Sequence, residues 1–364
     1  MKKFIWAIAL ILFNSMVCLQ ASERVGETVW TEASELTMVG KLMETPNPYH
    51  RVDTVKYKGF TQSEKNQVIS SSGLAVAFRT DSPSIWIQTD FGYRNRAANT
   101  MGMALRGYDL YVKVKGEWTY AASRVSSETN EENVWTLIKG MDGTMKEFLL
   151  YLPLYSEEYS IKLGTMSGAR IEAIEPPFRH RVAIFGSSYT HGISCSRSGM
   201  TYPAQFARHT GIQLLSLGCS GNCKMQPYFA DVLCDVPDVD AFIFDCFSNP
   251  SAGMIRERLF PFIEKIQAAH PGVPLIFQQT IYREGRYADS EIDRKEAAKM
   301  EAAEEMMKKA VKKYKDVYFI HPDAANDLRE TSVDGIHPDN YGYTLWARSI
   351  EKPVLKILRR YGVK

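Results

Sequence analysis

Two different patterns of hydrophobic and polar residues divide the chain. Over about residues 30–170, hydrophobic residues alternate with small or polar ones in short stretches, for example at Leu74, Val76 and Phe78. Alternation with a period of two directs one face of a strand towards a core. Turn sequences such as Asp81-Ser82-Pro83 separate the stretches, and few helical patterns interrupt them. This half is therefore predicted to form an antiparallel β-sandwich.

After Pro176-Pro177 the pattern changes, because hydrophobic runs now alternate with helical patterns. The predicted strands cover residues 182–185, 214–217, 241–244, 275–277 and 317–320, and the predicted helices cover residues 202–209, 254–269, 291–315 and 341–360. Such repetition indicates a parallel sheet with helices on both faces, a three-layer α/β/α domain. We expect a signal peptide at 1–21, a β-sandwich domain at 25–175 and the α/β domain at 179–364.

The amino terminus has the parts of a secretory signal peptide. Lys2 and Lys3 precede an apolar run over residues 4–13, and small residues follow at Ala21-Ser22. The run is shorter than the roughly 20 apolar residues that span a bilayer, so we expect no membrane span in the mature chain. Cys18 raises the alternative of a lipoprotein, but the residues before it are a poor lipidation context. The predicted location is therefore secreted or periplasmic.

Composition and charge narrow the classes of partner. The chain has 364 residues, 45% of them hydrophobic and 24% charged, which is typical of a globular protein. Lys+Arg 44 against Asp+Glu 42 gives a formal net charge of +2, and Lys2 and Lys3 account for this excess. A nearly neutral mature chain lacks the broad basic surface that binds phosphates, so nucleic acid is not an expected partner.

Five cysteines remain after the predicted cleavage, so at least one has no partner within a monomer. They are Cys195, Cys219, Cys223, Cys234 and Cys246. Cys219 and Cys223 are too far apart for a CxxC redox pair, and no histidine-rich spacing accompanies them. We expect buried thiols or a single disulfide rather than a zinc site.

A serine follows the first predicted strand of the second half. The segment Gly186-Ser187-Ser188-Tyr189-Thr190-His191-Gly192 comes directly after the strand that ends at Phe185. In an open α/β sheet, ligands bind outside the carboxyl ends of the strands, and a helix amino terminus there favours developing negative charge. Ser188 is therefore a candidate nucleophile, although serine is also a preferred helix N-cap.

A histidine with its own carboxylate lies near the end of the chain, in Asp334-Gly335-Ile336-His337-Pro338-Asp339. A nucleophilic serine needs a base, and the base needs an orienting carboxylate. The three-residue spacing lets Asp334 reach the His337 ring, fix its tautomer and stabilise the imidazolium. His191 and His321 have no acidic residue three positions before them, so His337 is the candidate base. The alternative is an ordinary surface histidine.

Two further segments contain candidate donors for an oxyanion. Gly221 lies in Gly218-Cys219-Ser220-Gly221-Asn222 after the second predicted strand, and Asn249 follows the third. Because the carboxyl ends of parallel strands meet at one edge of a sheet, both should lie near Ser188. A turn glycine and a capping asparagine are the alternatives.

The order of these segments resembles that of the SGNH, or GDSL-type, hydrolase family over about residues 181–360. The segments are Gly-Ser-Ser-Tyr, Cys-Ser-Gly-Asn, Asp245-Cys246-Phe247-Ser248-Asn249 and Asp334-Gly335-Ile336-His337. Two departures are Ser187, where many members have Asp, and the third segment, which differs from the usual Gly-x-Asn-Asp.

The resemblance implies a role for each matching residue. Ser188 would be the nucleophile, His337 the base and Asp334 the carboxylate that orients it. Gly221, Asn249 and the backbone amide of Ser188 would be the oxyanion donors. No metal or organic cofactor is implied.

The first half carries a second resemblance. Gly107-Tyr108-Asp109-Leu110-Tyr111 is similar to the GxDLY signature of the β-domain that precedes a branch of bacterial SGNH esterases. That branch is common among secreted carbohydrate-processing proteins of gut-type bacteria. Asp109 either touches the substrate side or holds a strand end, and we favour the structural role.

The candidate residues predict a serine esterase that acts through an acyl-serine on a small-molecule or polysaccharide ester. The family resemblance and the export signal imply that it is secreted and removes acetyl groups from carbohydrates. The alternatives are a lipid-ester or thioester hydrolase and a non-catalytic carbohydrate-binding protein with the same fold. Tyr189, Tyr202, Tyr282 and Arg283 either line the approach to Ser188 or pack around it. The sequence defines neither the substrate-binding residues nor the oligomeric state.

Overall fold

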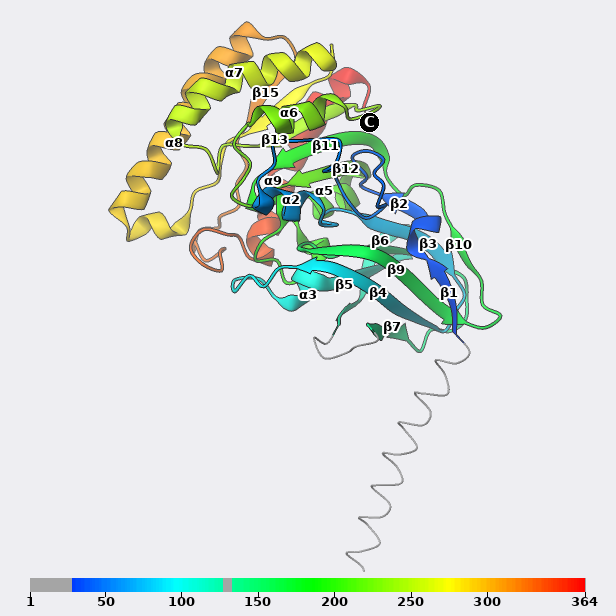
Figure 1. Cartoon of the computed structure of the whole chain (residues 1–364). Helices are drawn as coiled ribbons and strands as arrows, with labels where there is room; N and C mark the ends of the chain where they lie inside the picture. Colours follow the sequence, from blue (N-terminus) through cyan, green and yellow to red (C-terminus); the bar gives the residue numbers. More distant parts are fainter. Residues whose placement is uncertain (1–27, 127–132, 364) are drawn as a thin grey trace, which may run out of the picture.

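The computed structural model describes residues 28–126 and 133–363 (Figure 1). The predicted signal peptide and Cys18 lie outside the described residues. Two antiparallel sheets form the first half of the chain, which we call the β-sandwich region (residues 28–173). One sheet has the order β1-β9-β4-β7, with β1 Thr28–Glu32, β9 Ser156–Met166, β4 Ser84–Arg94 and β7 Val134–Lys139. The other has the order β10-β3-β8-β5-β6, with β10 Ile171–Ala173, β3 Ala75–Thr80, β8 Lys146–Tyr151, β5 Gly107–Val114, β6 Glu117–Val125 and, paired to β3, β2 Thr37–Val39.

The core of this region lies between the two sheets. Val76 and Phe78 of β3 pack in one cluster with Ile85 and Ile87 of β4, and all four side chains are fully buried. The residues between them on each strand face the other way, as a period of two requires. The prediction of an antiparallel β-sandwich is therefore confirmed.

Short helices interrupt the strands of the β-sandwich region. They are η1 Ala33–Glu35, α2 Gln62–Val68 and α3 Gly102–Arg106. Helix α2 begins with a capping box, in which the Thr61 side chain accepts from the Glu64 backbone N–H and the Glu64 carboxylate accepts from the Thr61 N–H. The alternating pattern of this half did not indicate these helices.

The second half, which we call the α/β region (residues 179–363), contains one sheet of five parallel strands in the order β12-β11-β13-β14-β15. The strands are β11 Arg179–Gly186, β12 Ile212–Gly218, β13 Ala241–Asp245, β14 Leu275–Gln278 and β15 Val317–Ile320. The helices are α4 Ser188–His191, η2 Ser198–Met200, α5 Tyr202–Thr210, α6 Pro227–Cys234, α7 Ala252–Ala269, η3 Glu284–Tyr287, α8 Ser290–Lys313, α9 Asn340–Leu358 and η4 Arg359–Tyr361.

Successive residues of each strand bury their side chains on opposite faces of the sheet. Ala183 and Phe185 of β11 pack with residues of α6, α7 and α8, whereas Val182 and Ile184 pack with residues of α5 and α9. Both faces of the sheet are therefore covered, as the continuous hydrophobic runs of a parallel sheet require. The predicted three-layer arrangement is confirmed. Among the α-helices of eight or more residues in the described part of this region, the eight-residue α6 is the one that the sequence did not indicate.

The two regions pack directly on each other, with the parallel sheet above the sandwich in Figure 1. Asp109 of β5 is fully buried, and its Oδ2 accepts hydrogen bonds from Arg197 Nη1 at 2.7 Å and from the Gly199 N–H at 2.8 Å. Tyr111 Oη accepts a second bond from Arg197 Nη1. The Asp and the second Tyr of the GxDLY signature thus join the sandwich to the loop before α5. Within the described residues, no helix combines the length and the apolarity needed to cross a bilayer.

Candidate active site

Three strands of the parallel sheet end in register. Gly186 of β11 pairs with Gly218 of β12 on one side and with Asp245 of β13 on the other. The loops that contain Ser188, Gly221 and Asn249 start directly after these residues. The site lies outside the carboxyl ends of the strands, beside the point where the strand order reverses, which is where ligands bind in open α/β sheets.

The turn that carries Ser188 is tight because α4 packs against the end of β12. Ser187 is the N-cap of α4, its Oγ accepting from the Tyr189 N–H at 3.2 Å, and Ser188 is the first helical residue. A Cβ on Gly218 would lie 2.3 Å from the backbone nitrogen of His191, so no other residue fits there. The N-cap role expected as an alternative for Ser188 belongs to its neighbour.

A buried carboxylate, Asp245, fixes this turn from the neighbouring strand. Its Oδ2 accepts from the Ser187 backbone N–H at 3.1 Å, from Ser187 Oγ at 2.8 Å and from Thr190 Oγ1 at 2.9 Å. Burial raises the pKa of Asp245 to about 6, although these hydrogen bonds act in the opposite direction. No role was predicted for Asp245 from the sequence. The one feature that could have indicated a role is the position of this carboxylate at the end of a hydrophobic strand.

The loop before α9 brings His337 to Ser188. His337 Nε2 lies 3.1 Å from Ser188 Oγ, and His337 Nδ1 lies 2.8 Å from Asp334 Oδ2. Because Nδ1 faces a carboxylate, it carries the proton, and Nε2 is left to accept from the serine hydroxyl. The structure thus brings together the three residues that the sequence nominated from opposite ends of the α/β region.

Asp334 also orders the backbone of its own loop and is reached from the β-sandwich region. Its Oδ1 accepts from the backbone N–H groups of Ile336 and His337, and Asn99 Nδ2 donates to its Oδ2 at 2.8 Å. Burial acts to raise the pKa of Asp334, but the hydrogen bonds from His337 and Asn99 outweigh it and lower the pKa to about 2. The carboxylate is therefore ionised at neutral pH, and Asn99 is a contact that no sequence pattern indicated.

The three predicted oxyanion donors have free N–H groups. Within the described residues, no acceptor is bound by the backbone N–H of Ser188, by that of Gly221 or by Nδ2 of Asn249. Asn249 Oδ1 accepts from the Cys223 N–H at 3.2 Å, which links the Asn249 loop to the Gly221 loop and leaves the amide NH₂ available. Unpaired donors in loops that follow strands adjacent to the one before Ser188 are suited to stabilising an oxyanion.

The tyrosines that could have lined the approach to Ser188 pack around the site instead. Tyr189 and Tyr202 are fully buried, and Tyr202 stacks on Trp346. The Tyr189 hydroxyl donates to the Ile336 carbonyl at 3.1 Å and accepts from Arg283 Nε at 2.9 Å, so both side chains support the His337 loop. Tyr282 has an aromatic contact with Tyr287 instead.

The other histidines do not serve Ser188. His191 is fully buried, and its Nε2 lies 2.7 Å from the Leu154 carbonyl, while His321 Nε2 lies 2.6 Å from Glu304 Oε1. The five cysteines in the described part of the chain are all free thiols. Among the same residues, no group of three or more His, Cys, Asp or Glu side chains could hold a metal ion.

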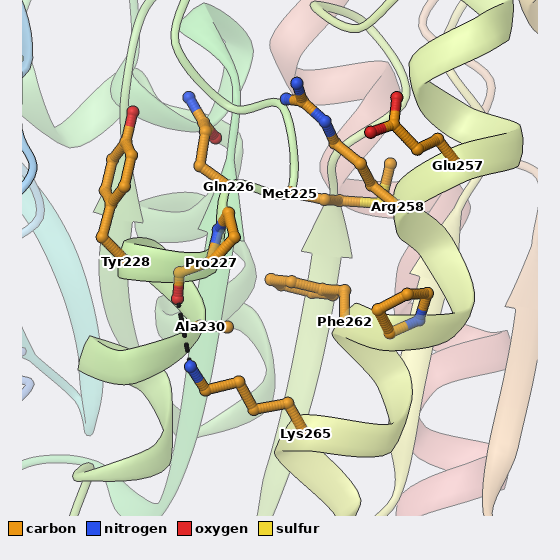
Figure 2. A pocket seen from close by; sticks show the side chains of 10 residues that line it. Met225, Gln226, Pro227, Tyr228, Ala230, Glu257, Arg258, Phe262 and Lys265 are labelled. Atoms are coloured by element: carbon orange, nitrogen blue, oxygen red, sulfur yellow. Dashed lines mark hydrogen bonds between the residues drawn. The ribbon is translucent and has the colours of Figure 1, made fainter.

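Two hollows of about 510 Å³ lie in the molecular surface, one in the α/β region and one between it and the β-sandwich region. Figure 2 shows the first, a groove between α6 and α7 where Phe262 and Lys265 face Pro227, and Ser188 does not line it. The second is a cleft beside the Asp334 loop, and Ser188 does not line it either. Its lining combines the β-sandwich loop and the α/β region: Ala98, Asn99, Thr100, Met101, Ser194, Ser196, Val333, Asp339 and Asn340.

Comparisons with known proteins show the family of the chain. A model of the GDSL-like lipase/acylhydrolase family matches residues 179–356, and a model for the N-terminus of SGNH hydrolase-type esterases, GxDLY, matches residues 28–171. A crystal structure described as a GDSL-like lipase from Bacteroides ovatus is 36% identical, with a TM-score of 0.87, over 91% of this chain and 98% of that one. The chain belongs to the GDSL-like lipase/acylhydrolase family. Both resemblances inferred from the sequence are confirmed.

More distant structures share the fold of this GDSL-like protein. A salicylyl-acyltransferase from a tetracycline biosynthetic pathway is 19% identical with a TM-score of 0.68, covering 93% of this chain and 99% of that one. A family two carbohydrate esterase from Cellvibrio japonicus is 11% identical with a TM-score of 0.61, covering 91% and 98%. No curated protein sequence matched the chain.

Proposed function

We propose that this GDSL-like protein is an exported serine esterase that removes acetyl groups from a carbohydrate through an acyl-serine intermediate. The observation that carries the proposal is the chain of contacts from Asp334 through His337 to Ser188, at 2.8 Å and 3.1 Å. These separations are within hydrogen-bond reach, as transfer of the serine proton to a base requires.

In the first half of the reaction, Ser188 Oγ attacks the ester carbonyl carbon while His337 Nε2 takes its proton. The carbonyl oxygen becomes an oxyanion, which would accept from the N–H groups of Ser188, Gly221 and Asn249. When the carbon–oxygen bond to the alcohol breaks, His337 gives its proton to the departing oxygen. Water then attacks the acyl-serine with His337 again as base, and acetate leaves as Ser188 recovers its proton.

The cleft beside the Asp334 loop offers hydrogen-bonding groups to a hydroxyl-rich alcohol. Five of its nine lining residues carry hydroxyl or amide side chains, Asp339 is its one carboxylate, and neither lysine nor arginine is among them. Such groups can exchange hydrogen bonds with sugar hydroxyls, while Ala98, Met101 and Val333 provide apolar surface beside them. The likeness in fold to carbohydrate esterases of family two adds to this support.

The experiment that tests the proposal is acetate release from a panel of acetylated plant and host polysaccharides. We expect release by the wild type and a fall in kcat of about 10⁴–10⁶ in Ser188→Ala, as for other lost nucleophiles of this kind. Ser290→Ala, an exposed serine at the start of α8, is the matched control and should keep full activity.

Two outcomes would replace the proposal. A preference for decanoate over acetate among esters of one alcohol would favour a lipid-ester hydrolase. No hydrolysis of any activated ester, together with no labelling of Ser188 by an organophosphate, would indicate a carbohydrate-binding protein that uses the same fold.

A further inference from the structure

Two side chains of the β-sandwich region hold Ser220, the residue before the predicted oxyanion donor. Gln67 of α2 donates from Nε2 to the Ser220 carbonyl oxygen at 3.0 Å. Tyr155, directly before β9, has its hydroxyl 2.5 Å from Ser220 Oγ. Both contacts cross from one region to the other, and they fix this residue at its backbone and at its side chain.

The contact of Gln67 acts on the peptide group that contains the Gly221 N–H. The Ser220 carbonyl and the Gly221 N–H belong to one planar trans unit, so they point in opposite directions, and fixing one fixes the other. A hydrogen bond accepted by the carbonyl also polarises the unit and strengthens its N–H as a donor. The orientation and the strength of this donor therefore depend on Gln67.

Gly221 is held by a turn of its own loop and, as a glycine, by no side-chain contact of its own. Its φ is +71°, it is exposed, and a Cβ placed on it would meet no atom within 4 Å. Within the loop, the Asn222 N–H donates to the Cys219 carbonyl at 3.0 Å, which closes a turn over Ser220 and Gly221, and Asn222 Nδ2 donates to the Ser220 carbonyl at 3.1 Å. Gln67 adds a restraint on the donor from outside the loop.

The two side chains that supply the restraint are themselves rigid. Tyr155 is 3% exposed and stacks on the buried His191 ring with 3.9 Å between ring centres. Helix α2 is held against α6, because Glu64 accepts from Tyr228 Oη at 2.9 Å and from Gln226 Nε2 at 3.1 Å. Its last turn is fixed by the fully buried Arg51, which donates to the Gln67 carbonyl and, at 3.0 Å, to the Gly218 carbonyl.

We propose that Gln67 is a positioning residue, which sets the direction of the Gly221 N–H for the oxyanion. The β-sandwich region thereby helps to form the oxyanion site. The inference rests on the proposed function, because the oxyanion arises only if Ser188 attacks an ester. Gln67 touches no reacting atom. Its effect is confined to the transition state, where the carbonyl oxygen gains its charge.

The test compares Gln67→Met, which keeps the length and loses the donor, with Gln62→Met on the same helix. The Gln62 side chain is exposed and donates to Asn66, away from Ser220. With 4-nitrophenyl acetate we expect Gln67→Met to lower kcat about tenfold, less than the 10²–10³ for losing a donor outright, while KM stays within twofold. Gln62→Met should match the wild type in both constants, and Gln67→Lys, which restores a donor, should recover part of kcat.

A second readout does not depend on activity. Deuterium uptake by the backbone of residues 218–223 should be faster in Gln67→Met than in wild type, and unchanged in Gln62→Met. Equal kcat in the two Met variants, or a fall that appears in KM alone, overturns the inference. If the wild type hydrolyses no ester, the proposed function fails, and unchanged uptake in Gln67→Met then overturns the positioning role as well.

Discussion

A single carboxylate, Asp334, organises the residues at one end of the candidate triad. It accepts two backbone N–H groups of its own loop, the His337 ring and the Asn99 side chain. Each bond favours the ionised form, which keeps the carboxylate charged and able to stabilise an imidazolium. The position of His337 thus follows from the ordered loop and does not depend on one contact alone.

We expect the side-chain amide of Asn249 to stabilise the oxyanion in the transition state. In Asn249→Ala, kcat should fall by about 10²–10³ with little change in KM, because one oxyanion donor is lost. Kinetics with an activated acetate ester would measure this. Asn66→Ala, on α2, is the control, and equal kcat in both variants would exclude Asn249 from the oxyanion hole.

Asp245 should make the stability of the protein depend on pH. Its pKa rises from an ordinary 3.8 to about 6 in the fold, so the native state binds this proton more tightly than the unfolded chain. The resulting stabilisation, on the order of 2–3 kcal/mol, is complete below about pH 4 and is lost as the pH rises through about 6. The free energy of unfolding, measured with urea between pH 4 and 7, should fall with rising pH in the wild type and fall less in Asp245→Asn. An identical slope in both would contradict the assignment.

Ser188, Asp334 and His337 could be predicted from the sequence because each has a local pattern. Ser188 follows the end of a strand, and Asp334 and His337 are three positions apart. Asn99 and Gln67 could not be predicted in this way. Asn99 is 235 positions from Asp334, and Gln67 is 153 positions from Ser220. Amide side chains in such contacts leave no periodic or spacing signal, so only the folded chain reveals them.

At the scale of elements, the strand ends determine where the site forms. The hydrophobic runs of the α/β region were long enough to predict all five parallel strands, whereas α2 and α6 were missed. Helix α6 has eight residues and starts with Pro227, and α2 lies in a half dominated by alternation. Short helices bury too few residues to produce a recognisable 3.6-residue period.

The end of β12 should tolerate no side chain. In Gly218→Ala the new Cβ would lie 2.3 Å from His191 N, so α4 or β12 must move. Overpacking of this kind typically costs about 1–3 kcal/mol, and moving α4 should also lower kcat. Thermal unfolding and ester hydrolysis would measure both effects.

Gly253→Ala is the matched control for this change. Gly253 is exposed on α7, and its nearest atom would lie 3.8 Å away. Alanine is the better helix former, so this variant should be neutral or more stable by up to about 1 kcal/mol. A Gly218→Ala protein as stable as Gly253→Ala would contradict the packing argument.

At the scale of the whole molecule, the two regions share buried contacts. Val39, Ala75 and Tyr151 of the sandwich pack with Phe178 and Ala204 in one hydrophobic cluster. Arg51 of the β-sandwich region donates to the carbonyls of Ser216 and Gly218 in β12. Neither region can separate without exposing apolar surface and leaving polar groups unpaired.

We therefore expect the chain to unfold in one cooperative transition. Calorimetry should give a single peak, and Arg51→Met should move that peak to lower temperature without splitting it, since it removes the donor from four carbonyl groups, those of Gln67, Ser70, Ser216 and Gly218. Two resolved peaks in the wild type would show that the regions are independent.

The links from Gln67, Tyr155 and Asn99 to the α/β region also restrict how such a protein can be re-engineered or diversified. A chimera that took its sandwich from another family member would inherit a foreign surface at Ser220 and Asp334. Chimeras without these three side chains should fold but have a low kcat. Introducing the three side chains into the foreign sandwich should restore kcat.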